Sequence, residues 1–507
     1  MKTNILLATA FAAVCGFTSC GDVLDIYPVE NNTADQFYKS EYEMNQAVMG
    51  MYARLGRNGT NTDYPTDMYY QASESRSDNL YYATMANAQR DQVDMRTFQC
   101  TDNTSLNTTI YGRLWEIVTD ANTLLAKSDE SYTRFRAEAK FMRALAYFDL
   151  VRAYGPQPIV DRIISAQKAP SFERKPIAEV YQFIIKDLTD AAADLEPFYT
   201  GDDAGRVGAV AAKCLLGYVY VTMAGYPLND AQAYAKAVEI LAPIMTDVKA
   251  RFAPNFADVF SLANENKYDL FSVQFSSGGS GLGSSLPAYI TQSGGKTTCF
   301  PEWAYYPQQG QDFRVDTLLV NDMVAAGDKR LCSIAQGFWT TTKHGYTRQD
   351  TLSSYDDRCV IVKFLVKDNT TTTIKAWNDY PLNFPMLRPA DAYLLYAEAL
   401  VATGRAGEAA PWLNAIRERA GLSDIANPTV ADIMRERRVE FLGEGKRYFD
   451  LVRMGKDTFL NTLKAFSDHY QHVKVMNASD PTEKDMLLPI PLSVMSIHTT
   501  WKNNDGY

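Results

Sequence analysis

Acidic and basic side chains gather most densely between residues 435 and 453. The members are Arg435, Glu436, Arg437, Arg438, Glu440, Glu444, Arg447, Asp450 and Arg453. Two carboxylates that act as catalytic acid and base need surroundings that push their pKa values apart. Here, side chains of opposite charge recur three and four residues apart, which is the spacing of ion pairs along a helix. The pattern therefore predicts a mutually paired face that fixes helices to each other rather than a catalytic centre.

Other patterns that could support chemistry are incomplete. His469 and His472 could share a metal ion beside Asp468, but two ligands do not make a site, and the sequence has no HExxH motif. The glycine-rich stretch 278–283 lacks the lysine of a phosphate loop, and no GxSxG motif marks a nucleophile. We therefore predict no enzymatic activity, no metal and no cofactor. A glycosidase that uses two carboxylates is the alternative within the enzymes.

Two segments, 64–82 and 303–346, combine aromatic rings with polar side chains. Sugars present flat C–H faces ringed with hydroxyls, so a sugar site needs aromatic platforms beside hydrogen-bonding groups. The candidate ligand-binding residues are Tyr69, Tyr70, Arg76, Asp78, Asn79, Tyr81, Trp303, Tyr305, Tyr306 and Trp339. The chain has 31 tyrosines, and many of them must belong to the core. A structural role is therefore the alternative for each of these aromatic residues.

The elements that must position these residues are predicted to be mainly helical. Residues 134–154 carry apolar side chains on more than one face of a helix, and Gly155-Pro156 ends the pattern. Such a helix packs against neighbours on several sides. Segments 207–224 and 233–241 read as two helices joined by a short turn, which is a helical hairpin.

A second hairpin is predicted over residues 390–420, where the pattern matches a tetratricopeptide repeat. Ala397 and Ala409 are the small residues that let the two helices approach closely, and Gly404 marks the turn between them. Tyr393 occupies the position where that repeat usually has tryptophan. The expected fold is therefore mainly α, a helical scaffold with tetratricopeptide-like helix pairs.

Composition changes between about residues 250 and 385, where glycine, serine, threonine and aromatic residues accumulate. We expect loops and short strands in this insertion, with the helical scaffold covering about 30–250 and 386–465. Binding residues are often displayed on loops by a rigid scaffold, so the insertion is the expected place of specificity. Its aromatic residues argue against a disordered linker, because disordered segments are poor in aromatics.

The N-terminus has the features of a signal peptide over residues 1–19, with Lys2, an uncharged apolar stretch and the small residues Thr18-Ser19. Cys20 follows directly, an arrangement that resembles the lipobox of bacterial lipoproteins. The resemblance implies that Cys20 is acylated and anchors the mature chain, residues 20–507, to a membrane. A plain signal peptide that happens to contain cysteine is the alternative.

The net charge of −10 excludes a basic field for nucleic acid, so no nucleic-acid partner is expected.

Five cysteines remain after the N-terminal region, an odd and widely spaced set that makes no disulfide framework: Cys100, Cys214, Cys299, Cys332 and Cys359. One bridge among the last three stays open, with buried free thiols as the commoner outcome.

Ordered motifs along the whole chain resemble the SusD/RagB family of nutrient-binding lipoproteins. They are Phe37, Glu41, Ala47 and Tyr52; Ala137 to Ala144 with Tyr147-Phe148 and Tyr154-Gly155; Ile433 to Gly455 with its charged pattern; Leu488-Pro489-Ile490-Pro491; and Asn504-Asp505-Gly506-Tyr507. The resemblance implies one SusD-like domain over 20–507. It also implies a lipid anchor on the outer membrane at the cell surface and partnership with a SusC-like TonB-dependent transporter.

The resemblance further implies that the protein captures oligosaccharides and performs no chemistry on them. A peptide ligand, as in the RagB-like branch, is the alternative within the family. A scaffold that holds protein partners through its helix pairs, without a small ligand, is the alternative from another class.

Overall fold

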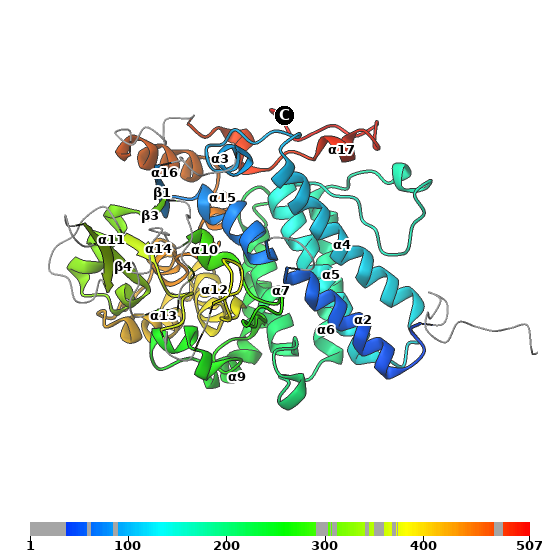
Figure 1. Cartoon of the computed structure of the whole chain (residues 1–507). Helices are drawn as coiled ribbons and strands as arrows, with labels where there is room; N and C mark the ends of the chain where they lie inside the picture. The colour runs from blue at the N-terminus through cyan, green and yellow to red at the C-terminus, as the bar shows by residue number, and fades with distance from the viewer. Residues whose placement is uncertain are drawn as a thin grey trace, which may run out of the picture.

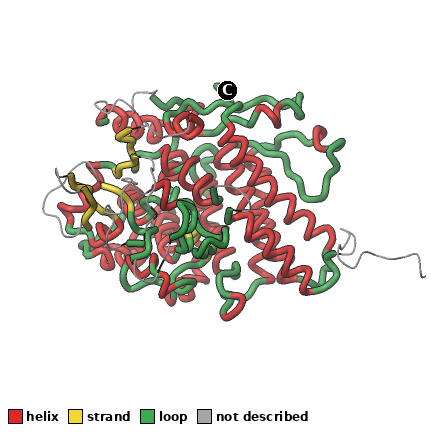
Figure 2. Tube along the Cα trace, in the orientation of Figure 1, coloured by secondary structure: helices red, strands yellow, loops and turns green. Residues whose placement is uncertain are grey.

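The computed structural model describes residues 37–57, 62–84, 90–290, 303–304, 306, 312–339, 344–348, 359–367, 372, 374–470 and 480–507. Helices dominate this part of the chain and form the body of the molecule, while short strands lie at one side (Figures 1 and 2). The prediction of a mainly α fold is therefore confirmed.

The helices follow each other along the chain with short connections. Their bounds are α2 Glu41–Leu55, α3 Arg90–Arg96, α4 Ser105–Lys127, α5 Thr133–Tyr154, α6 Ile177–Asp194, α7 Ala209–Ala224, α8 Gln232–Leu241, α9 Met245–Ala250, α10 Leu286–Ile290, α11 Thr317–Ala326, α12 Pro389–Ala402, α13 Ala406–Ala420, α14 Val430–Glu440, α15 Arg447–Arg453, α16 Lys456–His469 and α17 Leu492–Met495. Shorter turns of helix include η1 Pro65–Gln71, η2 Glu74–Arg76, η6 Phe256–Phe260, η7 Leu262–Asn264, η8 Lys329–Ser333 and η10 Glu483–Met486.

The long helices stack side by side. Helix α5 packs between α4 and α6, α6 packs on α7, α7 on α8, and α12 packs on α7, α8, α13 and α14. Figure 1 shows α2, α4, α5 and α6 as one group of long helices and α12 and α13 in the other half of the molecule. The result is a continuous layered core that runs from the N-terminal helices to the C-terminal ones.

Helix α5 joins neighbouring layers because it is buried on more than one face. Almost every side chain from Phe141 to Tyr154 is buried, including residues on opposite faces of the helix. The helix ends at Gly155, whose φ of 72° favours glycine, and a Cβ there would lie 2.9 Å from Cδ1 of Leu487. The sequence prediction for 134–154, including its stop, is confirmed.

Both predicted hairpins are present. Helices α7 and α8 pack against each other, as do α12 and α13. In the second pair Ala397 and Ala409 are fully buried, and Gly404 makes the turn with a φ of 79°. The Tyr393 ring meets Trp412 edge-on, with 5.0 Å between ring centroids. Small residues thus allow close approach, and aromatic rings fill the space beside them.

Small antiparallel sheets lie in the insertion and join it to neighbouring segments. The strands are β1 Leu80–Thr84, β2 Phe271–Val273, β3 Asp312–Val315, β4 Ile334–Trp339, β5 His344–Arg348, β6 Cys359–Ile361 and β7 Phe384–Leu387. They pair as β1 with β3, β2 with β7, and β5–β4–β6. In the first pair Tyr81 lies opposite Arg314, so the segment 64–84 is joined to the insertion. In the part of the chain that the structure describes, no helix combines the length and apolar composition needed to cross a membrane.

Candidate functional site

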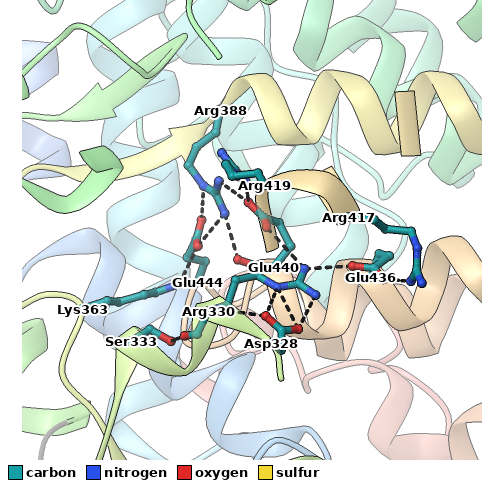
Figure 3. Close-up of polar contacts among 10 residues, drawn as sticks. All are labelled: Asp328, Arg330, Ser333, Lys363, Arg388, Arg417, Arg419, Glu436, Glu440 and Glu444. Carbon is teal, nitrogen blue, oxygen red and sulfur yellow. Dashed lines mark hydrogen bonds and ion pairs between the residues drawn. The ribbon is translucent and has the colours of Figure 1, made fainter. Parts of the chain in front are cut away.

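A buried ionic cluster lies where the C-terminal helices meet the insertion (Figure 3). Glu440, at the end of α14, is fully buried and accepts from Arg388 at 2.8 Å and from Arg419 at 2.5 Å, and Arg330 lies 3.5 Å away. Burial raises the pKa of Glu440, but Arg419, Arg388 and Arg330 outweigh that effect and hold the pKa well below its usual range. Glu440 is therefore a fixed negative charge.

Glu444 connects the same cluster to the insertion. Its carboxylate accepts from Nε of Arg388 at 2.9 Å and from Nζ of Lys363 at 2.6 Å. Burial lowers the pKa of Lys363, and Glu444 counteracts that effect. Figure 3 shows Lys363 reaching Glu444 from a different segment of the chain than Arg388 does. One carboxylate thus joins a strand-rich segment to the helical scaffold.

The rest of the charged block is paired in the same manner. Glu436 binds Arg330 at 2.9 Å and Arg417 at 2.5 Å, and Asp450 binds Arg437 at 2.8 Å. The prediction that the block is paired and fixes helices to each other is confirmed. Among the described residues, the pairs are mutual within the block only where Asp450 binds Arg437 and Arg453, and the other carboxylates bind residues outside it. Because these groups are buried rather than solvated, removing one partner is costly.

A cleft of about 570 Å³ opens beside this cluster, and we call it the insertion cleft. Its lining residues are Phe256, Ala257, Asp258, Phe260, Ser261, Leu262, Ala263, Trp303, Cys332, Ser333, Val362, Lys363, Leu365, Val366, Lys367, Thr372 and Leu382. Its volume lies within the range of about 300–1,000 Å³ that is typical of small-molecule sites. The cleft lies in the insertion, and the expectation that the insertion carries specificity stays a prediction.

The insertion cleft combines aromatic rings with hydrogen-bonding groups. Trp303, Phe256 and Phe260 supply the rings, and Nζ of Lys363 lies 4.7 Å from the ring centroid of Phe260. Ser333 donates its hydroxyl to the carbonyl oxygen of Arg330 at 2.7 Å within the η8 turn, and the Arg330 side chain joins that turn to the cluster. The ionic cluster therefore positions the lining residue Lys363, and Ser333 lies in the same turn as Arg330 of the cluster.

Candidates in the first segment occupy buried positions. Tyr69 and Tyr70 lie on η1 and are 6% and 0% exposed. The Tyr69 hydroxyl donates to Asp149 at 3.3 Å, and the Tyr70 hydroxyl donates to the carbonyl oxygen of Tyr289 at 3.1 Å. Tyr81 is 3% exposed and stacks on Tyr470 with 4.0 Å between ring centroids. These rings support the core where they lie.

The polar candidates of that segment bind the C-terminal helices. Arg447 forms two hydrogen bonds with the Asp78 carboxylate, at 2.7 and 2.9 Å, and Arg438 donates to Asn79 at 3.0 Å. Arg76 donates to the carbonyl oxygen of Asp485 at 2.8 Å. Burial raises the pKa of Asp78, but Arg438 and Arg447 outweigh that effect and lower the pKa to about 2. Ligand contact by these residues stays a prediction, and their partners give them a structural role.

Candidates in the second segment have different positions. Trp303 lines the insertion cleft and packs among Val362 and Leu365. The backbone N–H of Tyr306 donates to the hydroxyl of Tyr380 at 3.2 Å. Trp339 ends strand β4, while its side chain and Tyr305 lie outside the described residues, as do Cys20 and the segment 1–19. Trp303 is thus the candidate that the described structure brings into a cleft of ligand size.

Sequence reasoning missed Phe256, Phe260 and Lys363. A signal was present, because Phe256 and Phe260 lie close together in the sequence, and their ring centroids are 5.5 Å apart. Lys363 carried no such signal, since its partner Glu444 lies 81 residues further along the chain.

The histidine pair considered and rejected as a metal site is only partly described. His469 lies 3.2 Å from the Thr317 hydroxyl and packs on Tyr470, and His472 falls outside the described residues. Within the described ranges, no group of three His, Cys, Asp or Glu residues is arranged to hold a metal ion. Cys100 and Cys214 are buried free thiols, and Cys299 lies outside the described residues.

Two sequence models of known families match the chain. The model described as "SusD family" matches residues 297–507, and the model described as "Starch-binding associating with outer membrane" matches residues 23–221. The chain belongs to the SusD/RagB family, which confirms the resemblance inferred from its motifs.

Individual relatives are distant in sequence but cover most or all of the chain. A SusD-like protein of Bacteroides ovatus is 27% identical over 89% of this chain and 82% of its own length. The starch-binding protein SusD of Bacteroides thetaiotaomicron is 24% identical over the full length of both chains.

Solved structures share the fold. A SusD homologue from Bacteroides thetaiotaomicron superimposes with a TM-score of 0.78 at 20% identity, covering 94% of this chain and 98% of that one. A laminarin-binding SusD-like protein superimposes with a TM-score of 0.71 at 22% identity, covering 93% of this chain and 100% of that one. At these identities the likeness concerns the fold alone.

Proposed function

We propose that this protein is a cell-surface glycan-binding lipoprotein that captures oligosaccharides and delivers them to a SusC-like TonB-dependent outer-membrane transporter. The observation that carries the proposal is the insertion cleft, where Trp303 and two phenylalanines stand beside serine, threonine and lysine side chains. Aromatic faces beside hydrogen-bonding groups suit sugar rings.

Family membership supports the same class of ligand. One matching family is described as starch-binding and associating with the outer membrane, and relatives are described as binding starch and laminarin. Acylation of Cys20 would hold the protein at that membrane, and a Cys20→Ser variant is expected to leave the membrane fraction. We propose binding without catalysis, so a glycan incubated with the protein is expected to be recovered intact.

Isothermal titration against a panel of oligosaccharides and peptides tests the ligand class. We expect saturable binding of at least one glycan, and a Trp303→Ala variant is expected to weaken it by about tenfold, equivalent to about 1.4 kcal/mol. The matched control is Tyr42→Ala, because Tyr42 is a 70% exposed ring on α2 that does not line the cleft. A thermal melt of each variant separates loss of binding from loss of folding.

Contrary results would be informative. Binding of peptides and of no glycan would move the ligand class to peptides. Equal affinities of the Trp303→Ala and wild-type proteins for the glycan would remove the insertion cleft as its site. Delivery is tested separately, by asking whether the membrane-anchored protein co-purifies with a large outer-membrane barrel protein.

A further inference from the structure

Trp377 is a partly exposed ring that lies outside the lining of the insertion cleft but packs against the same hydrophobic cluster as Trp303. The Trp377 ring meets the ring of Tyr289 edge-on, with 5.9 Å between ring centroids. Tyr289 is partly exposed as well. The cluster thus carries one tryptophan in the cleft wall and a second one beyond it.

The chain leads directly from the cleft wall to Trp377. Thr372 lines the cleft, and Thr372 and residues 374–377 are all partly or fully exposed. Ile374 packs against the small cluster that includes Val366 of the cleft wall. Trp377 follows Thr372 by five residues, and five residues span at most about 18 Å. The segment therefore runs along the surface from the cleft to Trp377 over a short distance.

Asp379 holds this segment in place. Its carboxylate accepts from the backbone N–H groups of Lys375 at 3.0 Å, of Gly279 at 3.0 Å and of Gly278 at 3.2 Å. The ammonium group of Lys375 donates to the carbonyl oxygen of Gly278 at 2.8 Å. Both glycines have a positive φ, of 108° and 80°, which glycine adopts readily. Because Trp377 stands between two such fixed residues, its position is set before a ligand binds, which lowers the entropic cost of binding.

Polar groups surround this part of the surface. The side chains of Ser276, Ser280 and Lys375 are exposed, and Arg57 is partly exposed and donates to the carbonyl oxygen of Asn378 at 3.4 Å. Glucose units suit such surroundings, because their equatorial hydroxyls leave both faces of the sugar ring apolar. An aromatic ring can stack on such a face while neighbouring polar groups bind the hydroxyls.

We propose that Trp377 is a second sugar-stacking ring, which binds the part of a linear gluco-oligosaccharide that extends beyond the insertion cleft. This inference rests on the proposed function, because the insertion cleft must hold the first sugar units. A short chain occupies the cleft alone, whereas a longer chain gains a second contact. Trp377 therefore sets the preference for chain length.

Titration of the full-length protein with maltotriose, maltoheptaose, laminaritriose and laminariheptaose tests this inference. We expect the longer member of at least one series to bind more tightly than the shorter one. Trp377→Ala is expected to weaken binding of that longer chain by about threefold to tenfold and to leave the shorter chain unchanged. Trp303→Ala is expected to weaken both chains, because Trp303 lines the cleft.

The matched control is Trp412→Ala. Trp412 is a partly exposed ring on α13 that meets Tyr393 edge-on, with 5.0 Å between ring centroids, and it lies outside the cleft lining. This control is expected to change neither affinity. Trp377→Phe keeps an aromatic ring and is expected to retain part of the preference for the longer chain. A thermal melt of each variant shows that the protein is folded.

Two outcomes would overturn the role of Trp377 and leave glycan binding by the cleft intact. One is an unchanged affinity of Trp377→Ala for the longer chain. The other is an equal loss for the short and the long chain, which would show that Trp377 supports the cleft itself. Absence of binding by all four sugars at millimolar concentration would also overturn the inference. The wider panel of glycans would then decide separately whether the cleft binds a glycan at all.

Discussion

Replacing Glu440 by glutamine removes one negative charge from the centre of the buried ionic cluster and keeps the size of the side chain. Arg388 retains the Glu444 carboxylate at 2.9 Å, and Arg330 retains Asp328 at 2.6 Å. Arg419 is different, because Glu440 is its carboxylate partner and the Arg419 side chain is only 4% exposed. The substitution therefore leaves one buried guanidinium without its counter-charge.

The magnitude follows from that uncompensated charge. Removing one partner of a buried ion pair destabilises proteins by about 3–5 kcal/mol. The entropy of unfolding is about 2.1 cal/mol/K per residue, or about 1.1 kcal/mol/K for a chain of 507 residues that unfolds as one unit. The Glu440→Gln variant is therefore expected to melt about 3–5 °C below the wild type.

Differential scanning calorimetry of four proteins tests this expectation. The control is Glu408→Gln, which removes the same charge from an exposed pair with Arg405, whose side chains are 60% and 42% exposed. This control is expected to shift the melting temperature by less than about 1 °C. A double variant, Glu440→Gln with Arg419→Gln, removes the stranded charge and is expected to recover part of the loss. The reasoning fails if Glu440→Gln melts within 1 °C of the wild type, or if the exposed control loses as much.

Further predictions concern two glycines and two carboxylates. Gly445 has a φ of 70°, and a Cβ there would lie 2.1 Å from the carbonyl oxygen of Tyr69, so Gly445→Ala is expected to lose more than about 3 kcal/mol of unfolding free energy. Gly407→Ala, in α13 with no atom within 4 Å of the added Cβ, is expected to gain about 0.5–1 kcal/mol; chemical denaturation measures both. The pKa of Asp78 is lowered to about 2, so its contribution of about 2 kcal/mol is present above pH 4 and lost as the pH falls towards 2. Burial raises the pKa of Asp67 to about 6, so Asp67 weakens the fold as the pH rises from 4 to 6. The Asp67→Asn variant should therefore gain stability relative to the wild type over that range. Melting temperatures measured against pH test this, and a constant difference between the two proteins from pH 4 to 6 would contradict the assignment.

Local patterns in the sequence predicted the helical scaffold because a helix is specified by residues three and four apart. The α5 prediction, for example, differs from the structure by one residue at its start, Thr133 in place of 134. The hairpin of α12 and α13 was predictable because Ala397, Ala409 and Gly404 lie close together in the sequence. The charged block was predicted to be paired, but its partners were not predictable from local spacing, because Glu440 binds Arg388 and Glu444 binds Lys363.

Contacts between distant segments were not predictable in this way. The Asp78 carboxylate binds Arg447, which lies 369 residues further along the chain. An aromatic and polar segment such as 64–82 has the same composition whether it faces a ligand or a buried polar layer. Only the partners distinguish the two, and here Asp149, Arg438 and Arg447 supply them.

The ionic cluster holds residues that line the insertion cleft, so ligand binding and stability are expected to be linked. Lys363 lines the cleft and is held by Glu444, while Ser333 lines it and is held by the backbone of Arg330. A change within the cluster should therefore alter both the melting temperature and ligand affinity, since it frees the residues that shape the cleft. A change at Trp303 should alter ligand affinity with a smaller effect on the melting temperature, because the ion pairs of the cluster form between other residues. Comparing the two kinds of variant thus separates the residues that contact ligand from those that hold the cleft in shape.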